Sequence, residues 1–246
     1  MVPARASDTT SQGEPGGAGG VSPLHLNPTA PLAERVLLPG DPHRALAVAQ
    51  AILEEPRMFN HTRGLWGYTG RARDGEPLTV QSTGMGGPSA AIVVEELIDL
   101  GARRLLRIGT CGALDPELEL GTLVSAERVL AGDGTSRALG AGDSLEADPA
   151  LAAALREAGA RPVTAVTTDV FYDGGARLEE WQRAGAGVVE MEASALIAVA
   201  ERRGVPAAVL LGVTDQLATG GRERIDGEGY EQLGVRLGEA AWAALA

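Results

Sequence analysis

Two carboxylates, Glu190 and Glu192, stand one residue apart where an apolar segment passes into a helical pattern. Residues 188–194 are Val-Val-Glu-Met-Glu-Ala-Ser, and the apolar run after them ends before Gly204. An ionised carboxylate accepts hydrogen bonds and donates none, which suits a partner with paired hydroxyls such as a ribose. Considered alone, the segment is better explained by Glu192 capping its own helix or facing solvent.

Two glycine-bearing loops each follow an apolar strand and open a helix. Residues 38–44 are Leu-Pro-Gly-Asp-Pro-His-Arg, and residues 82–89 are Ser-Thr-Gly-Met-Gly-Gly-Pro-Ser. Glycine lets backbone N–H groups approach an anion, and a helix N-terminus adds a favourable dipole. Arg44 supplies a full charge for a phosphate, whereas Met85 offers an adaptable apolar contact for a ring or a sugar. An ordinary strand-to-helix turn explains the first loop, and close packing explains the second, without any ligand.

Residues 107–113, Arg-Ile-Gly-Thr-Cys-Gly-Ala, place an arginine near the end of a largely apolar strand. An unpaired guanidinium is expensive there, so Arg107 needs an anion, either a carboxylate or a bound phosphate. Thr110, expected just past the strand, adds a hydroxyl and an N–H that complete an oxyanion site. We therefore favour the phosphate over a structural salt bridge.

Two further positions are ambiguous when each is taken alone. Asp215 ends the last apolar strand, where it acts either as a general acid in a partly dry cleft or as the cap of a turn. Phe171 and Tyr172 follow another strand, and they either stack on a planar base or pack in the core.

The composition excludes several classes of function. The net charge is −12, from 33 acidic and 21 basic residues, and such a surface repels nucleic acid and anionic membranes. All the basic residues are arginine, which excludes a lysine-dependent P-loop and Schiff-base chemistry. Three histidines without metal-ligand spacing and the single Cys111 argue against a metal site and a disulfide framework. With no signal-like start and no membrane-length apolar run, we expect a cytoplasmic protein.

Apolar periodicity predicts a single three-layer α/β domain over residues 23–246, with a mixed, mostly buried central sheet flanked by helices. Residues 1–22, rich in Gly, Ser, Thr and Pro, are expected to be a disordered extension. A Gly- and Asp-rich loop near 131–147 is the least defined part. The expected strands are 35–38, 66–71, 78–82, 104–108, 122–130, 163–167, 188–190 and 207–213. The expected helices are 44–54, 88–100, 149–158, 177–184, 192–203 and 229–245.

Taken in order, these motifs resemble the nucleoside phosphorylase family, and in particular its bacterial hexameric-type purine nucleoside phosphorylases. The resemblance runs from about His25 to the C-terminus. Its segments are Pro-Gly-Asp-Pro-x-Arg, Ser-Thr-Gly-Met-Gly, Arg-Ile-Gly-Thr-Cys-Gly-Ala, Val-Phe-Tyr, Val-Glu-Met-Glu-Ala and Val-Thr-Asp. It implies reversible phosphorolysis of purine ribo- and deoxyribonucleosides, with inorganic phosphate as co-substrate and without a metal or organic cofactor.

The resemblance also implies roles for individual positions. Phosphate would be held by Gly40, Arg44, Arg63, Arg107, Ile108, Gly109 and Thr110. The nucleoside would be held by His25, Met85, Cys111, Gly112, Phe171, Val189, Glu190, Met191, Glu192, Thr214 and Asp215, with Glu192 on the ribose hydroxyls. Protonated Asp215 would be the catalytic acid toward N7 of the purine, assisted by Arg224 or Arg222. Because His25 and Arg63 serve a neighbour's site in that family, we expect a homo-oligomer with sites shared across a dimer interface, assembled as a hexamer.

The nearest rival function is that of a uridine phosphorylase, which performs the same reaction on a pyrimidine nucleoside. The resemblance implies that such enzymes read uracil with a Gln-x-Arg on an insertion. The corresponding interval here, residues 173–187, is short and has Arg177 and Gln182 in the wrong arrangement. Asp215 also favours a purine.

A nucleosidase and a nucleoside-binding protein would differ in chemistry. A hydrolytic nucleosidase would have no need of Arg44 and Arg107, because water replaces phosphate. A non-catalytic nucleoside-binding protein would keep Glu192 but have no use for a protonatable Asp215. One departure from the family pattern is Gln216, which follows the acid where histidine often stands and could alter the base preference.

Overall fold

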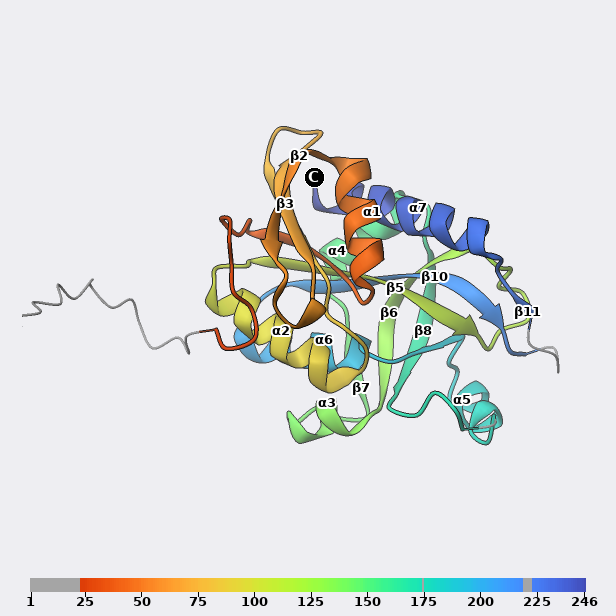
Figure 1. Ribbon diagram of the computed structural model, residues 1–246. Helices are drawn as coiled ribbons and strands as arrows, with labels where there is room; N and C mark the ends of the chain where they lie inside the picture. Colours follow the sequence, from red (N-terminus) through yellow and green to blue (C-terminus); the bar gives the residue numbers. More distant parts are fainter. Residues whose placement is uncertain (1–22, 174, 219–222) are drawn as a thin grey trace, which may run out of the picture.

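A computed structural model describes residues 23–173, 175–218 and 223–246. A mixed β-sheet forms the centre, and helices pack on both of its sides (Figure 1). This arrangement confirms the predicted α/β class with a central sheet between helices. The expected extension, residues 1–22, lies outside the described residues.

The strands are β1 (Arg35–Pro39), β2 (Leu53–Asn60), β3 (Gly67–Ala72), β4 (Pro77–Gln81), β5 (Arg104–Ala113), β6 (Leu123–Gly132), β7 (Ser144–Glu146), β8 (Arg161–Thr168), β9 (Val188–Glu190), β10 (Ala207–Gln216) and β11 (Glu223–Arg224). The helices are α1 (Pro42–Ile52), α2 (Gly87–Asp99), α3 (Gly134–Ala138), α4 (Pro149–Glu157), α5 (Leu178–Arg183), α6 (Ala193–Arg203) and α7 (Gly227–Leu245), with a short 3₁₀ turn, η1, at Thr62–Gly64.

The long strand β5 lies at the centre of the sheet. It pairs in parallel with β1 on one side and with β10 on the other. From β10 the pairing continues through β6, β8 and β9 and returns to the end of β5, so five strands form a closed circle. Neighbouring strands protect one another's backbone groups there, as in a barrel. The circle explains why β10 is buried along its whole length.

Apolar stripes on the helices form one core on each side of the sheet. Helices α2 and α6 cover one side, and α1, α4 and α7 cover the other (Figure 1). Side chains such as Leu97 and Leu196 on the first side, and Leu237 on the second, are fully buried. Each such leucine contributes about 1.5–3 kcal/mol of hydrophobic stabilisation. None of the helices within the described ranges is long and apolar enough to cross a membrane.

Several boundaries differ from the sequence prediction. Helix α1 ends at Ile52, and the chain turns directly into β2, which the periodicity did not indicate because its middle residues are mostly exposed and include a proline, Pro56. The interval 131–147 is not an undefined loop, since it contains α3 and β7. Strands β5 and β10 run further than their apolar stretches, to Ala113 and Gln216, because pairing with each other carries them on.

Candidate active site

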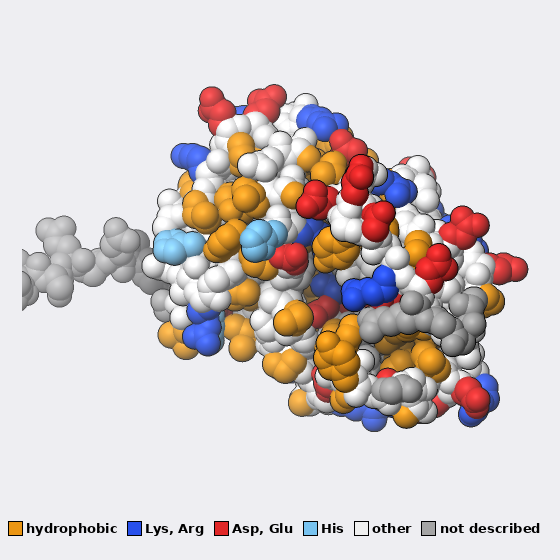
Figure 2. All heavy atoms as spheres, turned by 45° about the vertical axis from the view of Figure 1, so that its right-hand side comes forward, with side chains coloured by type: hydrophobic (Ala, Val, Ile, Leu, Met, Phe, Trp, Pro, Cys, Tyr) orange, Lys and Arg blue, Asp and Glu red, His pale blue; other side chains and the backbone are white. Residues whose placement is uncertain are grey.

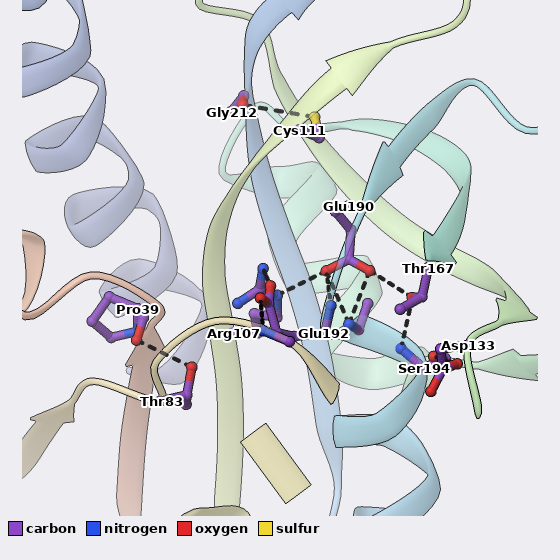
Figure 3. Close-up of polar contacts among 12 residues, drawn as sticks. Pro39, Thr83, Arg107, Cys111, Asp133, Thr167, Glu190, Glu192, Ser194 and Gly212 are labelled. Carbon is purple, nitrogen blue, oxygen red and sulfur yellow. Dashed lines mark hydrogen bonds and ion pairs between the residues drawn. The ribbon is translucent and has the colours of Figure 1, made fainter. Parts of the chain in front are cut away.

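The loops after β1 and β4 are joined to each other by backbone hydrogen bonds. The N–H of Thr83 donates to Pro39 O at 2.8 Å, and the N–H of Gly84 donates to Gly40 O at 3.0 Å. The hydroxyl of Thr83 also donates to Pro39 O, at 3.4 Å (Figure 3). Gly84 has a φ of 74° and Gly86 a φ of 85°, a backbone conformation that favours glycine. The two glycine-bearing loops that the sequence indicated are therefore one surface at the sheet's edge.

Glu192 connects that surface to the central strand. One of its carboxylate oxygens, Oε1, accepts the N–H of Gly86 at 2.6 Å. The other, Oε2, accepts Nη2 of Arg107. The side chain thus points away from its own helix, toward the glycine loop and the arginine, although Glu192 occupies the N-cap position of α6. The prediction that this residue caps its helix through its side chain is not what the structure shows.

Glu190 is the residue whose side chain caps α6. Its carboxylate accepts the N–H groups of Glu192 and Ala193, each at 2.9 Å, and the hydroxyl of Thr167 at 2.5 Å. It also accepts Nε of Arg107 at 3.1 Å. Burial raises the pKa of Glu190, and the adjacent Arg107 opposes that effect. The two acids thus make different contacts: Glu190 orders the turn into α6, whereas Glu192 faces the glycine loop.

Arg107 is therefore paired with two carboxylates, and the salt bridge that we rated below a bound phosphate is present (Figure 3). The side chain is 3% exposed. Burial lowers the pKa of Arg107, but Glu192 and Glu190 together raise it above its ordinary value. One donor is still available, because Nη1 of Arg107 is buried and has no hydrogen-bond partner. The guanidinium can bind a further anion while keeping both carboxylates.

The neighbours of Arg107 on β5 have specific places. Thr110 lies inside the strand, opposite Gly212 of β10, and not just past its end as expected. Ile108 is fully buried. Gly109 leaves room for the arginine, since a Cβ at this position would lie 2.7 Å from Arg107 Nη2.

The expected acid, Asp215, lies near the end of β10 and is 7% exposed. The antiparallel pairing of β10 with β11 places Arg224 directly opposite, with Nε 3.0 Å from Asp215 Oδ1. The hydroxyl of Thr214 donates to Asp215 Oδ2 at 3.0 Å. Of the two arginines expected near Asp215, Arg224 thus contacts it, while the other candidate, Arg222, lies outside the described residues.

The side chain of Gln216 is held by hydrogen bonds within the chain. Its amide nitrogen donates to the carbonyls of Asp115 and Leu118, each at 3.1 Å, and its oxygen accepts the N–H of Ala218 at 2.8 Å. These contacts tie the end of β10 to the loop after β5. The effect of Gln216 on base preference stays a prediction.

Arg44 is held by a residue that the sequence analysis did not single out. It is 7% exposed and donates from Nη2 to the hydroxyl of Tyr230 on α7, with its guanidinium 5.1 Å from the centre of that ring. Among the residues that the structure describes, no carboxylate forms an ion pair with Arg44. Its charge is therefore available to an anion. Tyr230 gave no local signal, because it lies 186 residues further along the chain.

The residues expected around the nucleoside differ in exposure. Met85 and Phe171 are exposed, at 86% and 52%, which leaves their apolar surfaces accessible to a ligand. Cys111 is buried, and its thiol contacts Gly212 O at 3.6 Å, so its side chain belongs to the core (Figure 3). Burial raises the pKa of that thiol. Gly112 lies opposite Val189 across β5 and β9.

His25 and Arg63 make no contact with the Arg107 cluster in this single chain. The Nδ1 atom of His25 lies 2.7 Å from Glu96 Oε1, and that carboxylate also accepts the N–H groups of residues 24–26. Arg63 is exposed and has a φ of 59°, an unfavourable backbone for a residue with a side chain. Strain of this kind is typical of functional sites.

The described surface has other features besides the Arg107 cluster, but none of them forms a better candidate site. On the face in Figure 2, acidic and basic side chains gather at a hollow in the middle of the molecule. A separate open hollow of about 510 Å³ is bordered by Arg161 and Arg236, but both arginines are exposed and donate to backbone carbonyls. Within the described ranges, no group of three or more His, Cys, Asp or Glu side chains could hold a metal ion.

Comparison with known proteins decides the family. A model described as "Phosphorylase superfamily" matches residues 34–245. The chain belongs to the phosphorylase superfamily. It is 38% identical over 201 residues to the "Purine nucleoside phosphorylase DeoD-type" of Geobacillus kaustophilus, a match that covers 78% of this chain and 85% of that protein. The protein of the same description from Alkaliphilus metalliredigens is 38% identical over 202 residues, covering 78% and 86%.

A solved member of the superfamily shares the fold. The crystal structure of purine nucleoside phosphorylase from Toxoplasma gondii in complex with immucillin-H superimposes with a TM-score of 0.78 at 28% sequence identity, covering 87% of this chain and 92% of that one. The resemblance drawn from the motifs is confirmed. His25 precedes the residues that the superfamily model matches, whereas the other predicted site residues lie within them.

Proposed function

We infer that this member of the phosphorylase superfamily catalyses the reversible phosphorolysis of purine nucleosides, releasing the free base and ribose 1-phosphate or its 2-deoxy form. It is an enzyme of the pentosyltransferase class. Apart from the similarity to relatives, one structural observation supports the inference. A buried arginine with a spare donor, Arg107, lies against a carboxylate, Glu192, that faces a glycine loop. An anion and a polyhydroxylated sugar can be bound side by side there.

Phosphate and ribose would be held from opposite sides. Arg44 and Arg107 provide charge, and Gly40 allows close approach of the loop to a phosphate dianion. Glu192 accepts hydrogen bonds from the ribose hydroxyls, with Met85 and Met191 against the sugar. As the glycosidic bond breaks, positive charge builds on the ribose, and the bound dianion faces it. Placement and electrostatics then lower the barrier without a covalent protein nucleophile.

The leaving purine takes on negative charge that a proton must neutralise. Asp215 would enter the step protonated on one carboxyl oxygen and donate that proton to N7, and Arg224 and Thr214, whose donors contact its two oxygens, would stabilise the carboxylate that the transfer leaves. The nucleophile is inorganic phosphate, so we propose that no metal or organic cofactor takes part.

The residues between Phe171 and β9 argue against a pyrimidine nucleoside as the substrate. Gln182 donates to Leu114 O at 2.8 Å, and Arg177 is paired with Glu180 on α5. Both side chains that could have read a uracil are therefore engaged in contacts with other parts of the chain.

The site also indicates an assembly. His25 and Arg63 make no contact with the cluster of their own chain, so we propose that they complete the site of a neighbour across a dimer interface. We further propose a hexamer made of such dimers, acting in the cytoplasm. No nucleic acid or membrane partner is proposed.

One assay tests the function. Base release from inosine, adenosine, guanosine and uridine is measured with and without inorganic phosphate. We expect release from the purine nucleosides that depends on phosphate, and little from uridine. Release indifferent to phosphate would indicate a nucleosidase, and binding without release would indicate a non-catalytic protein.

A further inference from the structure

A third buried carboxylate lies close to the Arg107 cluster. Asp133 precedes α3 and is 1% exposed. Its Oδ2 accepts the N–H of Ser136 at 2.7 Å, and its Oδ1 accepts the hydroxyls of Ser136, at 2.5 Å, and of Ser194 on α6. No cation in the described part of the chain forms an ion pair with it. Burying a charge without a counterion is costly, so these hydrogen bonds must offset the cost.

A continuous line of hydrogen bonds joins Asp133 to Arg107 (Figure 3). The N–H of Ser194 donates to Thr167 Oγ1 at 3.0 Å, and the Thr167 hydroxyl donates to Glu190 Oε1 at 2.5 Å. The other oxygen of Glu190 accepts Nε of Arg107. Every side chain in the line is buried. A shift at one end therefore has little room to be absorbed before it reaches the other.

The short helix α3, which follows Asp133, contacts two other parts of the site. The N–H of Gly134 donates to Asp169 Oδ2 at 2.8 Å, two residues before Phe171. At the start of α2, after the glycine loop, a Cβ at Gly87 would lie 2.9 Å from Thr135 Oγ1. The segment 133–135 thus borders the glycine loop, the start of α6 and the loop that carries Phe171.

We propose that Asp133 is a positioning residue of this site. By holding Ser194 at the start of α6, it keeps Thr167 and Glu190 in place and so fixes the direction in which Arg107 presents Nη1 to phosphate. Capping α3 needs only the contacts with Ser136, so the bond to Ser194 is the one that couples α3 to the site. This inference rests on the proposed phosphorolysis.

Two serines provide a matched pair of variants. Ser136 and Ser194 are both fully buried, and both donate a hydroxyl to the same oxygen of Asp133. Ser136→Ala removes a bond within the α3 cap, whereas Ser194→Ala removes the link to α6. We expect similar falls in Tm for both. For Ser194→Ala we expect the KM for phosphate to rise on the order of tenfold, and for Ser136→Ala less than about twofold. The KM for inosine should change little in either variant.

The measurements are steady-state inosine phosphorolysis and the rise in Tm on adding inorganic phosphate to the full chain. Asp133→Asn keeps the size of the side chain and serves as the second variant. It should raise the phosphate KM as Ser194→Ala does, and the double variant should add no further loss. Equal phosphate KM values in the two serine variants, or an unchanged value in Asp133→Asn, would overturn the positioning role alone. Phosphate-independent base release by the unaltered enzyme would instead overturn the proposed function, and the inference with it.

Discussion

Gly109 is the residue whose small size most directly serves the predicted phosphate site. A Cβ there would lie 2.7 Å from Nη2 and 2.9 Å from Cζ of Arg107, a guanidinium already held by Glu190 and Glu192. We expect Gly109→Ala to raise the KM for phosphate on the order of tenfold, because the guanidinium must move away from one carboxylate. Steady-state kinetics with varied phosphate measure the effect. The control is Gly142→Ala, where a Cβ meets open space. Equal phosphate KM values in the two variants would contradict the explanation.

Asp215 is the residue on which the chemical step depends in our proposal. Asp215→Asn keeps the shape of the side chain but cannot deliver the proton, so we expect kcat on inosine to fall by roughly 10²–10⁴-fold. A nucleoside already methylated at N7 leaves as a neutral base and needs no proton, so its turnover should fall far less. The comparison of inosine with 7-methylinosine is the measurement. An equal loss on both substrates would show that Asp215 acts in another way.

At the scale of single residues, the sequence selected side chains that the structure brings together around Arg107, but it did not indicate how they pair. The spacing of Glu190 and Glu192 and the apolar surroundings of Arg107 were enough to select them. The pairing of Arg107 with both acids was not visible, because 83 and 85 residues separate the partners along the chain. Tyr230 was missed for the same reason, since a tyrosine on an amphipathic helix carries no local sign of an arginine partner.

Among the elements, most helices and even the three-residue strand β9 were predicted, whereas β2, β7, β11 and α3 were not. Helices α2, α4 and α6 appear within one residue of their expected ends, because apolar periodicity and caps act locally. Strand β11 is Glu-Arg and β7 is Ser-Leu-Glu, so neither has an apolar run like the Val-Val of β9. Yet β11 is the strand that places Arg224 opposite Asp215. This strand forms because it pairs with β10, a contact between segments that local sequence does not reveal.

Helices α1 and α7 meet at the contact between Arg44 and Tyr230. Tyr230→Phe keeps the ring against the guanidinium but removes the hydroxyl that accepts from Nη2. We expect the free energy of unfolding to fall by about 1.5–3 kcal/mol, as for a hydrogen bond to a charged group. Because Arg44 then lacks a fixed direction, the KM for phosphate should also rise a few-fold. Urea unfolding and phosphate kinetics measure the two effects. A loss of stability with unchanged phosphate kinetics would place Arg44 outside the phosphate site.

For the whole molecule, the sheet's closed circle is what the sequence could not reveal. Near-continuous apolar strands predicted a sheet covered on both sides, and that was correct. The order in which β5, β10, β6, β8 and β9 pair depends on contacts between distant segments. Residues 1–22, expected to be disordered, lie outside the described part.

Acid should loosen the docking of residues 24–26 on α2. Burial raises the pKa of Glu96, but the hydrogen bonds from His25 and from the backbone N–H groups of Leu26, Leu24 and His25 together lower it below 4.5. Ionised Glu96 thus stabilises the folded chain at any pH above the pKa that this group has in the unfolded chain. That stabilisation is lost as the pH falls through the lower pKa of Glu96 in the folded chain. Urea unfolding across this range should show a shallower pH dependence for Glu96→Gln than for the unaltered chain. Identical slopes would show that Glu96 contributes nothing.

The proposal that two chains share each site can be tested by restoring activity from two defective chains. Arg63→Ala and Arg107→Ala should each nearly abolish phosphorolysis, provided that both arginines bind phosphate. If Arg63 serves the neighbour, a mixed dimer has one site with both defects and one intact site. Co-expression of differently tagged chains should then recover about a quarter of normal activity, because half of randomly formed dimers are mixed and half of their sites are intact. Mixing Arg107→Ala with Glu192→Gln is the control, since both residues belong to the same chain's cluster and every site then carries one defect. If Arg63 acted within its own chain, each site would carry its own chain's defect alone, and the co-expressed enzyme would stay as inactive as its parents.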